Sequence, residues 1–246
     1  VRAKWVVCNP EAMKSFSAIG YFFGKKLNEK LGVPMGLINS NWGGTPAEVW
    51  VPQDKVISNP TLANAAKKLQ TYEWWSSRAG DNYNAMIAPI LNYQIAGVLW
   101  YQGESNVSSY YSYEQLFTGM IDAWRAAWNK NFPFYFVQIA PYTYGNNING
   151  ALLRETQTKA SKHPNTAMVV VSDLVPDTTN IHPTLKIEVA NRLANIALKH
   201  IYNQNIGVVN GPLYESVQIE KDKVTLSFSN IGSGLMCKDK ELSHFE

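Results

Sequence analysis

Residues 98–106 read Val98-Leu99-Trp100-Tyr101-Gln102-Gly103-Glu104-Ser105-Asn106. The apolar run that begins at Ile95 and ends at Tyr101 predicts a buried strand. Amides, a carboxylate and a hydroxyl then crowd the turn at Gly103. Because ligands of open α/β sheets bind just beyond the carboxyl ends of the strands, this polar loop is a candidate wall of a functional site.

The flanking sequence alternates between strand-like and helix-like segments. Strands are expected at 35–40, 95–101, 134–140, 166–172 and 206–209, and helices at 10–31, 61–80, 111–129, 151–162 and 183–202. Such alternation predicts an α/β fold with a mainly parallel sheet and helices on both faces. From Pro212 the pattern changes, because 213–219 and 224–228 predict a β-hairpin. We therefore expect an α/β domain over 1–211 and the start of a β-rich C-terminal module over 212–246.

The composition argues against several classes of function. Of the 246 residues, 46% are hydrophobic and 17% are charged, as in a globular protein. The net charge of +3, with scattered lysines, does not argue for a nucleic-acid partner. No apolar stretch reaches the roughly 18 residues that cross a bilayer. Cys8 and Cys237 fit neither a disulfide framework nor a metal cluster, and no phosphate-binding or metal-ligand motif occurs, so we expect no cofactor and no metal.

Three polar clusters each follow a predicted strand, so a parallel sheet would gather them at its carboxyl edge. In the first, Gly43 and Gly44 let a backbone N–H approach a ligand closely, as an oxyanion hole requires; the alternative is a tight turn. In the second, Gln102 or Asn106 can donate a hydrogen bond to a developing oxyanion, and Glu104 can orient its neighbours. The alternative is a loop that merely caps a helix.

The third cluster ends in His182, which Pro183 holds at the mouth of a predicted helix. A histidine in this setting is a candidate general base, although it could simply cap the helix. Asp177 or Asp173 could steer the imidazole, and either could equally cap a turn. The other histidines, His163, His200 and His244, lie on polar stretches and are expected to be solvated.

Amide donors, close-approach glycines and one histidine together suggest acyl transfer by a serine nucleophile. No convincing nucleophile accompanies them. Ser105 lies in the second cluster but lacks the Gly-x-Ser-x-Gly setting of a nucleophile elbow. Ser40 ends a predicted strand, yet its neighbours fit an oxyanion turn better.

Further motifs match a known family and occur in the family's order over residues 5–200. They are Phe16-Ser17-Ala18 with Tyr21-Phe22-Phe23-Gly24; Gly36-Leu37-Ile38-Asn39-Ser40 with Trp42-Gly43-Gly44-Thr45-Pro46 and Trp50; Asn84-Ala85-Met86-Ile87; Trp100 to Asn106; and Ile181-His182-Pro183 with Lys186 and Arg192-Leu193. On these motifs the chain resembles the sialate O-acetylesterases and related bacterial carbohydrate acetylesterases of the SGNH hydrolase superfamily.

The resemblance implies a flavodoxin-like fold and a Ser–His hydrolysis of acetyl esters on sugars, such as sialic acid or xylan. It implies an oxyanion hole from Gly43 or Gly44 and from Gln102 or Asn106, with His182 as the base. Many SGNH enzymes carry an Asp where this chain has Thr179. The orienting acid is therefore Asp177, Asp173, a backbone carbonyl or none. A secreted or periplasmic location is also expected from the resemblance alone.

The family places its nucleophile in a Gly-Gln-Ser-Asn motif that precedes the segment matching Val1, and no Gly-Gln-Ser occurs in this sequence. The strand that carries it would lie between 35–40 and 95–101. Its absence would leave buried backbone groups unpaired, at roughly 1–3 kcal/mol each. We therefore expect a fragment that is inactive alone and whose partner is the upstream segment of the same protein.

Two other interpretations remain open. The first is an active hydrolase with a displaced nucleophile, either Ser105 or Ser40. The second is a non-catalytic carbohydrate-binding module that uses the aromatic residues Trp42, Trp74, Trp75 and Tyr101.

Overall fold

The computed structural model describes residues 4–145 and 148–237, which fall into two compact units, Val1–Ala194 and Asn195–Glu246. The α-helices are α1 (Pro10–Met13), α2 (Ala18–Leu31), α3 (Gln53–Ile57), α4 (Pro60–Ala66), α5 (Tyr110–Ala127), α6 (Asn149–Ala160) and α7 (Lys186–His200). Short 3-10 or π turns are η1 (Ala47–Trp50), η2 (Tyr83–Ile87), η3 (Ala88–Ile90), η4 (Glu104–Ser109) and η5 (Ser172–Leu174). The strands are β1 (Val98–Tyr101), β2 (Phe134–Val137), β3 (Thr166–Val169), β4 (Leu213–Glu220) and β5 (Lys223–Ser229).

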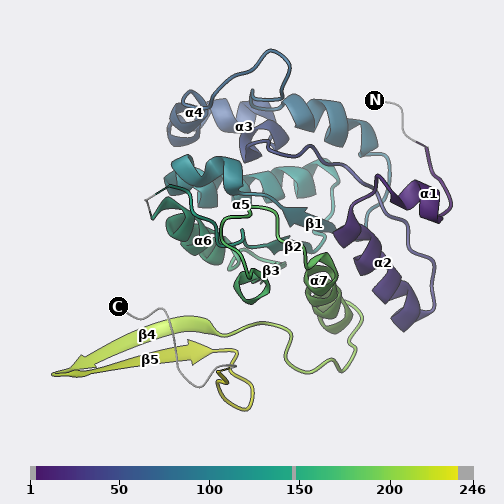
Figure 1. The fold of residues 1–246 in the computed structure, drawn as a ribbon. Coiled ribbons are helices and arrows are strands. Elements are labelled where there is room, and N and C mark those ends of the chain that lie inside the picture. The colour runs from purple at the N-terminus through teal and green to yellow at the C-terminus, as the bar shows by residue number, and fades with distance from the viewer. Residues whose placement is uncertain (1–3, 146–147, 238–246) are drawn as a thin grey trace. The chain divides into compact units, whose positions relative to one another are not determined.

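A parallel sheet in the order β1-β2-β3 is the framework of the first unit (Figure 1). The strands pair in register, since Tyr101 lies opposite Val137 and Val137 lies opposite Val169. Their carboxyl ends therefore share one edge. The helices α5 and α6 form the two crossovers, while α2 lies beside the start of α7 on the other side of the sheet. The predicted α/β class, with a parallel sheet and helices on both faces, is confirmed.

An aromatic core ties the sheet to the segment that precedes it in the chain. The ring of Trp100 on β1 lies 6.0 Å, between centroids, from each of Trp50 on η1 and Phe117 and Trp124 on α5. Buried residues recur along α5 at three- and four-residue intervals, which gives the helix one apolar face. The indole N–H of Trp124 also donates to the Trp50 carbonyl at 2.9 Å. Packing of α5 thus fixes the position of η1.

The single helix expected over 10–31 is wrong, because the chain forms two helices. Asn9 caps α1 through the Ala12 N–H at 2.9 Å, and Ser17 caps α2 through the Gly20 N–H at 3.2 Å. A serine hydroxyl that caps a new helix turns the backbone out of the preceding one. The expected stop is confirmed, since α2 ends at Gly32 in the left-handed region.

Two predicted strands and part of a predicted helix are also absent from the described residues. Residues 35–40 and 206–209 form no strand, because a strand needs a hydrogen-bonded neighbour and the described partner of β1 is β2 alone. The helix expected over 61–80 ends at Ala66. Beyond it, Tyr72 and Trp75 face each other in an isolated antiparallel bridge, which a helical backbone does not allow.

The second unit contains the predicted hairpin, in which β4 and β5 pair antiparallel from Leu213–Ser229 to Glu220–Lys223. Its two-residue loop begins at Lys221, whose φ of 52° suits the left-handed turns that match the twist of hairpin strands. A bulge interrupts the ladder between Tyr214 and Ser216. Across the described parts of the chain, no helix is long and apolar enough to span a membrane.

Candidate active site

The first two polar clusters meet at the carboxyl edge of the sheet. Ser105 Oγ donates to the Gly44 carbonyl at 2.9 Å, and Gln102 Nε2 donates to the Thr45 carbonyl at 3.1 Å. The Ala47 N–H in turn donates to Asn106 Oδ1 at 2.8 Å. Residues 43–48 and 102–106, about sixty positions apart in the chain, are thus joined by these three hydrogen bonds and by a fourth from Asn106 to Glu48.

Asn106 is the centre of this junction and is fully buried. Its Oδ1 accepts from Ala47 N and from Gln102 Nε2, the latter at 2.8 Å, and its Nδ2 donates to Glu48 Oε2 at 2.8 Å. Both ends of the side-chain amide therefore have protein partners. In this geometry Asn106 holds the two loops together and does not face the solvent.

Gln102 is half-buried and held from several sides. Tyr113 Oη donates to its Oε1 at 3.1 Å, and Gln157 Nε2 donates to its backbone carbonyl at 3.1 Å. Next to it, Gly43 and Gly44 are exposed, and Gly44 has a φ of 71° in the left-handed region. Among the described residues, no hydrogen bond uses the N–H of either glycine. These two donors are free to meet a ligand.

Position 103 accepts no residue larger than glycine, which leads to a first prediction. A Cβ on it would lie 2.5 Å from Ile139 Cγ2 and 2.9 Å from Gln157 Nε2, and its φ is 155°. Gln157 cannot give way easily, because its Oε1 accepts from the Ile139 N–H at 2.9 Å. Overpacking and backbone strain together should lower the free energy of unfolding of Gly103→Ala by about 2–5 kcal/mol.

Urea denaturation of the purified chain measures this loss. The matched control is Gly119→Ala on α5, where a new Cβ would meet no heavy atom within 4 Å. A helical Gly→Ala change of this kind should stabilise the chain by about 0.5–1 kcal/mol. Equal midpoints for the two variants would contradict the crowding at Gly103.

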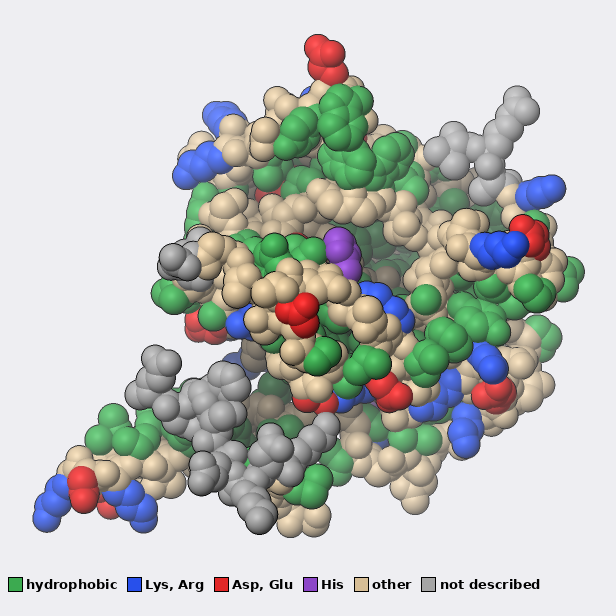
Figure 2. All heavy atoms as spheres, in the orientation of Figure 1, with side chains coloured by type: hydrophobic (Ala, Val, Ile, Leu, Met, Phe, Trp, Pro, Cys, Tyr) green, Lys and Arg blue, Asp and Glu red, His purple; other side chains and the backbone are tan. Residues whose placement is uncertain are grey.

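The third cluster approaches the second through Glu104. Burial raises the pKa of the Glu104 carboxyl, while the nearby charges of His182 and Lys186 act to lower that pKa. Lys186 Nζ also lies 5.4 Å from the ring centroid of Tyr101. The His182 side chain is exposed, and its backbone N–H donates to Asn180 Oδ1 at 2.9 Å. Figure 2 shows a histidine at the rim of a hollow in the surface, beside a Lys or Arg side chain.

The two aspartates of the third cluster have other partners. Asp177 is exposed, and its Oδ1 accepts from the N–H and the Oγ1 of Thr179 at 2.8 and 2.6 Å, which lowers the pKa of this carboxyl. Asp173 forms a bidentate ion pair with Arg192 at 2.7 and 2.6 Å. The charge of His182 also acts on the Glu104 carboxyl.

The two candidate serines hold loops in place. Ser105 Oγ donates to the Gly44 carbonyl, and Ser40 Oγ donates to the Met86 carbonyl at 3.3 Å. Neither hydroxyl proton is directed at His182, as it would be in a nucleophile that the histidine activates.

Sequence reasoning missed Glu48, the buried acid of this site. Its side chain is fully buried, so desolvation raises the pKa of its carboxyl, although the hydrogen bond from Asn106 acts in the opposite direction. Its Oε1 has no hydrogen-bond partner among the residues that the structure describes. The available signal was a lone acid in the apolar run Ala47-Glu48-Val49-Trp50.

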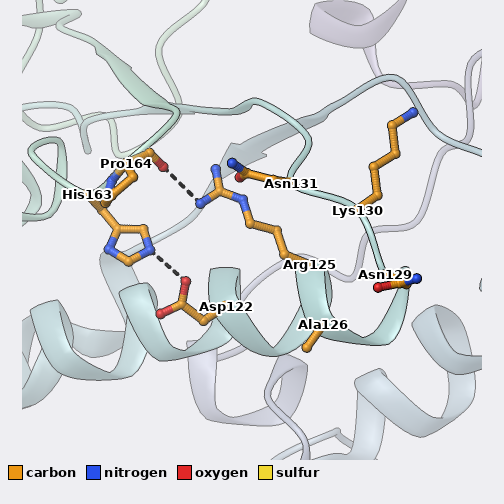
Figure 3. A pocket seen from close by; sticks show the side chains of 8 residues that line it. All are labelled: Asp122, Arg125, Ala126, Asn129, Lys130, Asn131, His163 and Pro164. Atoms are coloured by element: carbon orange, nitrogen blue, oxygen red, sulfur yellow. Dashed lines mark hydrogen bonds and ion pairs between the residues drawn. The ribbon is translucent and has the colours of Figure 1, made fainter.

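A separate hollow of about 450 Å³ lies at the opposite edge of the sheet, before β2 and β3 (Figure 3). His163 Nε2 lies 2.8 Å from Asp122 Oδ1 there. The Arg125 guanidinium donates to the carbonyls of Phe132, Pro164 and Asn165 at 2.8–3.1 Å.

His163 is thus paired and partly buried rather than fully solvated. His200 is exposed as expected, whereas His244 lies outside the described residues. None of the candidate site residues lines this hollow.

No group of three or more His, Cys, Asp or Glu side chains that could hold a metal ion occurs within residues 4–145 and 148–237. The chemistry of the carboxyl edge therefore has to be argued from N–H donors, one histidine and carboxylates.

Comparison with known proteins identifies the family of the chain. A family model described as "Carbohydrate esterase, sialic acid-specific acetylesterase" matches residues 8–199. Sialate O-acetylesterase of Homo sapiens is 32% identical over 241 residues, which cover 88% of this chain and 45% of that protein. The Mus musculus sialate O-acetylesterase is 30% identical over 248 residues, which cover 82% and 46%. The chain thus spans about half the length of the curated relatives it matches.

A solved structure matches as well. A carbohydrate acetylesterase from Xanthomonas citri superposes with a TM-score of 0.81 at 32% identity, over 93% of this chain and 51% of that one. The family model covers well over half of the sequence, including all three polar clusters. The chain therefore belongs to the carbohydrate esterase family of sialic acid-specific acetylesterases, with the SGNH hydrolase fold.

Proposed function

We propose that this chain is part of a carbohydrate O-acetylesterase, which removes acetyl groups from sialic acid or xylan-type sugars. The observation that carries the proposal is the hydrogen-bonded junction of loops 43–48 and 102–106 at the carboxyl edge of the sheet, beside the free N–H groups of Gly43 and Gly44. The charge of His182, which acts on Glu104 in the second of these loops, supports a place for the third cluster at the same site. Membership of the carbohydrate esterase family supports the class of substrate.

The nucleophile in this proposal is a serine from residues that precede Val1 in the parent protein. Two observations support an upstream source. The sequence contains no Gly-Gln-Ser, and the chain spans about half of the relatives it matches. The backbone of 35–40, which has no strand neighbour among the described residues, offers an edge at which an added strand could pair.

Hydrolysis then proceeds in two steps. The serine oxygen attacks the acetyl carbonyl while His182 takes the hydroxyl proton, and the oxyanion receives hydrogen bonds from the Gly43 and Gly44 N–H groups. His182 gives the proton to the departing sugar oxygen, which leaves an acetyl-serine. A water molecule, deprotonated by His182, attacks this ester, and acetate and the free serine are released.

The remaining predicted residues support these groups. Gln102 and Asn106 support the glycine turn rather than the oxyanion itself, because Gln102 Nε2 donates to the Thr45 carbonyl and to Asn106 Oδ1, and Asn106 also accepts from the Ala47 N–H. Glu104 stabilises the imidazolium of His182 through its charge. Asp177 would take that part only by exchanging Thr179 for His182. The secreted or periplasmic location stays a prediction.

Hydrolysis of 4-nitrophenyl acetate tests the proposal. We expect no turnover above the buffer rate from this chain alone, and turnover from a longer polypeptide that also contains the preceding residues of the parent protein. Turnover by the chain alone, lost in Ser105→Ala or Ser40→Ala, would mean that one of these serines is the nucleophile. Sugar binding without turnover in the longer polypeptide would favour the carbohydrate-binding module instead.

A further inference from the structure

Four aromatic side chains form a connected cluster on the surface, here called the aromatic platform: Trp42, Tyr72, Trp74 and Trp75. Neighbouring ring centroids lie 5.9 Å apart for Trp42 and Trp75, 5.4 Å for Trp74 and Trp75, and 5.6 Å for Tyr72 and Trp74. The cluster joins the residue before Gly43 to the loop that follows α4.

The aromatic platform is far more exposed than a core cluster would be. Trp74 is 74% exposed, and Trp42 and Tyr72 are 44% and 42% exposed. Exposed apolar surface of this size on a folded protein marks a place where something binds. In Figure 2 hydrophobic side chains gather on the loop that follows α4, which stands at the top of the view in Figure 1.

The aromatic platform adjoins the candidate active site directly. A Cβ on Gly44 would lie 3.3 Å from Cζ2 of Trp75, so this indole packs against the turn proposed to bind the oxyanion. Trp42 precedes the same turn in the chain, and its carbonyl accepts from Thr45 Oγ1 at 2.7 Å. A ligand lying on the rings would therefore extend away from the site of ester cleavage.

The loop that carries Trp74 is anchored at both ends. The Tyr72 N–H donates to Ser77 Oγ at 3.4 Å, and Ser77 is buried. Farther along, the Gly80 N–H donates to the backbone carbonyl of the buried Glu48 at 3.2 Å. These contacts hold the loop that carries the rings, which lowers the entropy cost of ordering the rings when a ligand binds.

The chemistry of the exposed rings indicates the class of ligand that the aromatic platform can bind. Indole and phenol rings offer flat apolar faces with polar edges, which match the C–H faces of a pyranose whose hydroxyls stay in water. The rings themselves carry no charge to pair with an anion. We propose that the aromatic platform binds neutral pyranose units of the glycan that flank the acetylated sugar. This inference rests on the proposed function and extends it to the specificity of the same site.

Sugar binding by this chain is the direct test, with tryptophan fluorescence as the signal and xylohexaose and sialyllactose as probes. Both probes contain neutral pyranoses, but only sialyllactose carries a sialic acid. Saturable quenching by xylohexaose, weakened about tenfold or more in Trp74→Ala, supports the inference, whereas quenching by sialyllactose alone would assign the binding to the sialic acid and overturn it. The matched control is Tyr111→Ala on α5, whose ring is 51% exposed outside the aromatic platform and should leave binding unchanged.

Kinetics with the longer polypeptide separate this inference from the proposed function. Trp74→Ala should raise KM for an acetylated oligosaccharide about tenfold and leave hydrolysis of 4-nitrophenyl acetate unchanged, since that ester has no sugar to stack. If neither ester is hydrolysed, the proposed function is wrong. The fluorescence titration still tests whether the aromatic platform binds sugars. Absence of quenching by both probes would overturn the inference. So would quenching unchanged in Trp74→Ala, or a self-association that this variant abolishes.

Discussion

Replacing His182 by Ala in the longer polypeptide is expected to lower kcat for 4-nitrophenyl acetate by about 10²–10⁴-fold, the usual contribution of a general base. KM should change little, because the exposed imidazole acts on protons of the serine, the leaving group and the water rather than on substrate binding. Initial rates over a range of ester concentrations give the two constants separately. His163 cannot substitute, since it lies at the opposite edge of the sheet.

His163→Ala is the matched control for this experiment. It removes an imidazole that is hydrogen-bonded to Asp122 and should leave kcat within about twofold of the parent value. A His182→Ala variant that keeps most of its activity would remove His182 from the mechanism. If His163→Ala were the inactive variant, the reacting groups would have to be sought in the hollow of Figure 3 instead.

Asn106→Ala is expected to cost this chain about 3–6 kcal/mol of unfolding free energy. The change leaves the buried Glu48 carboxyl and the buried Ala47 N–H without their Asn106 partner, and it removes one of the two acceptors of Gln102 Nε2. Each unsatisfied buried group costs roughly 1–3 kcal/mol. The loss should appear as a lower urea midpoint with an unchanged slope, which marks a change in stability rather than in the unfolded state.

Ser105→Ala provides the comparison, because it removes one hydrogen bond from an exposed side chain in the same loop. Its expected cost is about 0.5–1.5 kcal/mol. If Asn106→Ala were no more harmful than Ser105→Ala, water would have to replace the lost amide, and the junction would be less dry than its burial indicates.

The parts of the fold that could be predicted are those in which local pattern and tertiary packing agree. The apolar stripe of α5 and the turn chemistry of the hairpin specify their elements without help from distant residues. Residues 35–40 have a strand-like sequence, but a strand exists only where a neighbour pairs with it. At Ser17 the side-chain hydroxyl caps a new helix, so the preceding helix does not continue through this residue. The spacing of apolar residues alone does not predict this break.

In the candidate site, too, some features follow from the sequence pattern and others depend on tertiary packing. Because parallel strands bring their carboxyl ends to one edge, the meeting of the glycine turn with the Gln102 loop follows from topology. The role of Glu48 does not, since its burial depends on how η1 packs under α5. The partner of His182 was sought among aspartates near it in sequence. The charge of His182 also acts on Glu104, seventy-eight positions earlier, an approach in space that neighbours in sequence do not indicate.

Trp124 and Trp50 connect the hydrophobic core to the glycine turn of the proposed active site. The Trp124 indole binds the Trp50 carbonyl, and the Trp50 indole donates to Thr45 Oγ1 at 3.0 Å, one residue from Gly44. A helix on the face of the sheet is thus mechanically coupled to the turn whose N–H groups are proposed to receive the oxyanion. Exchanges of large hydrophobic residues along α5 would shift that turn by fractions of an ångström. Natural variation in rate among related chains can therefore arise in the interior, with every reacting group unchanged.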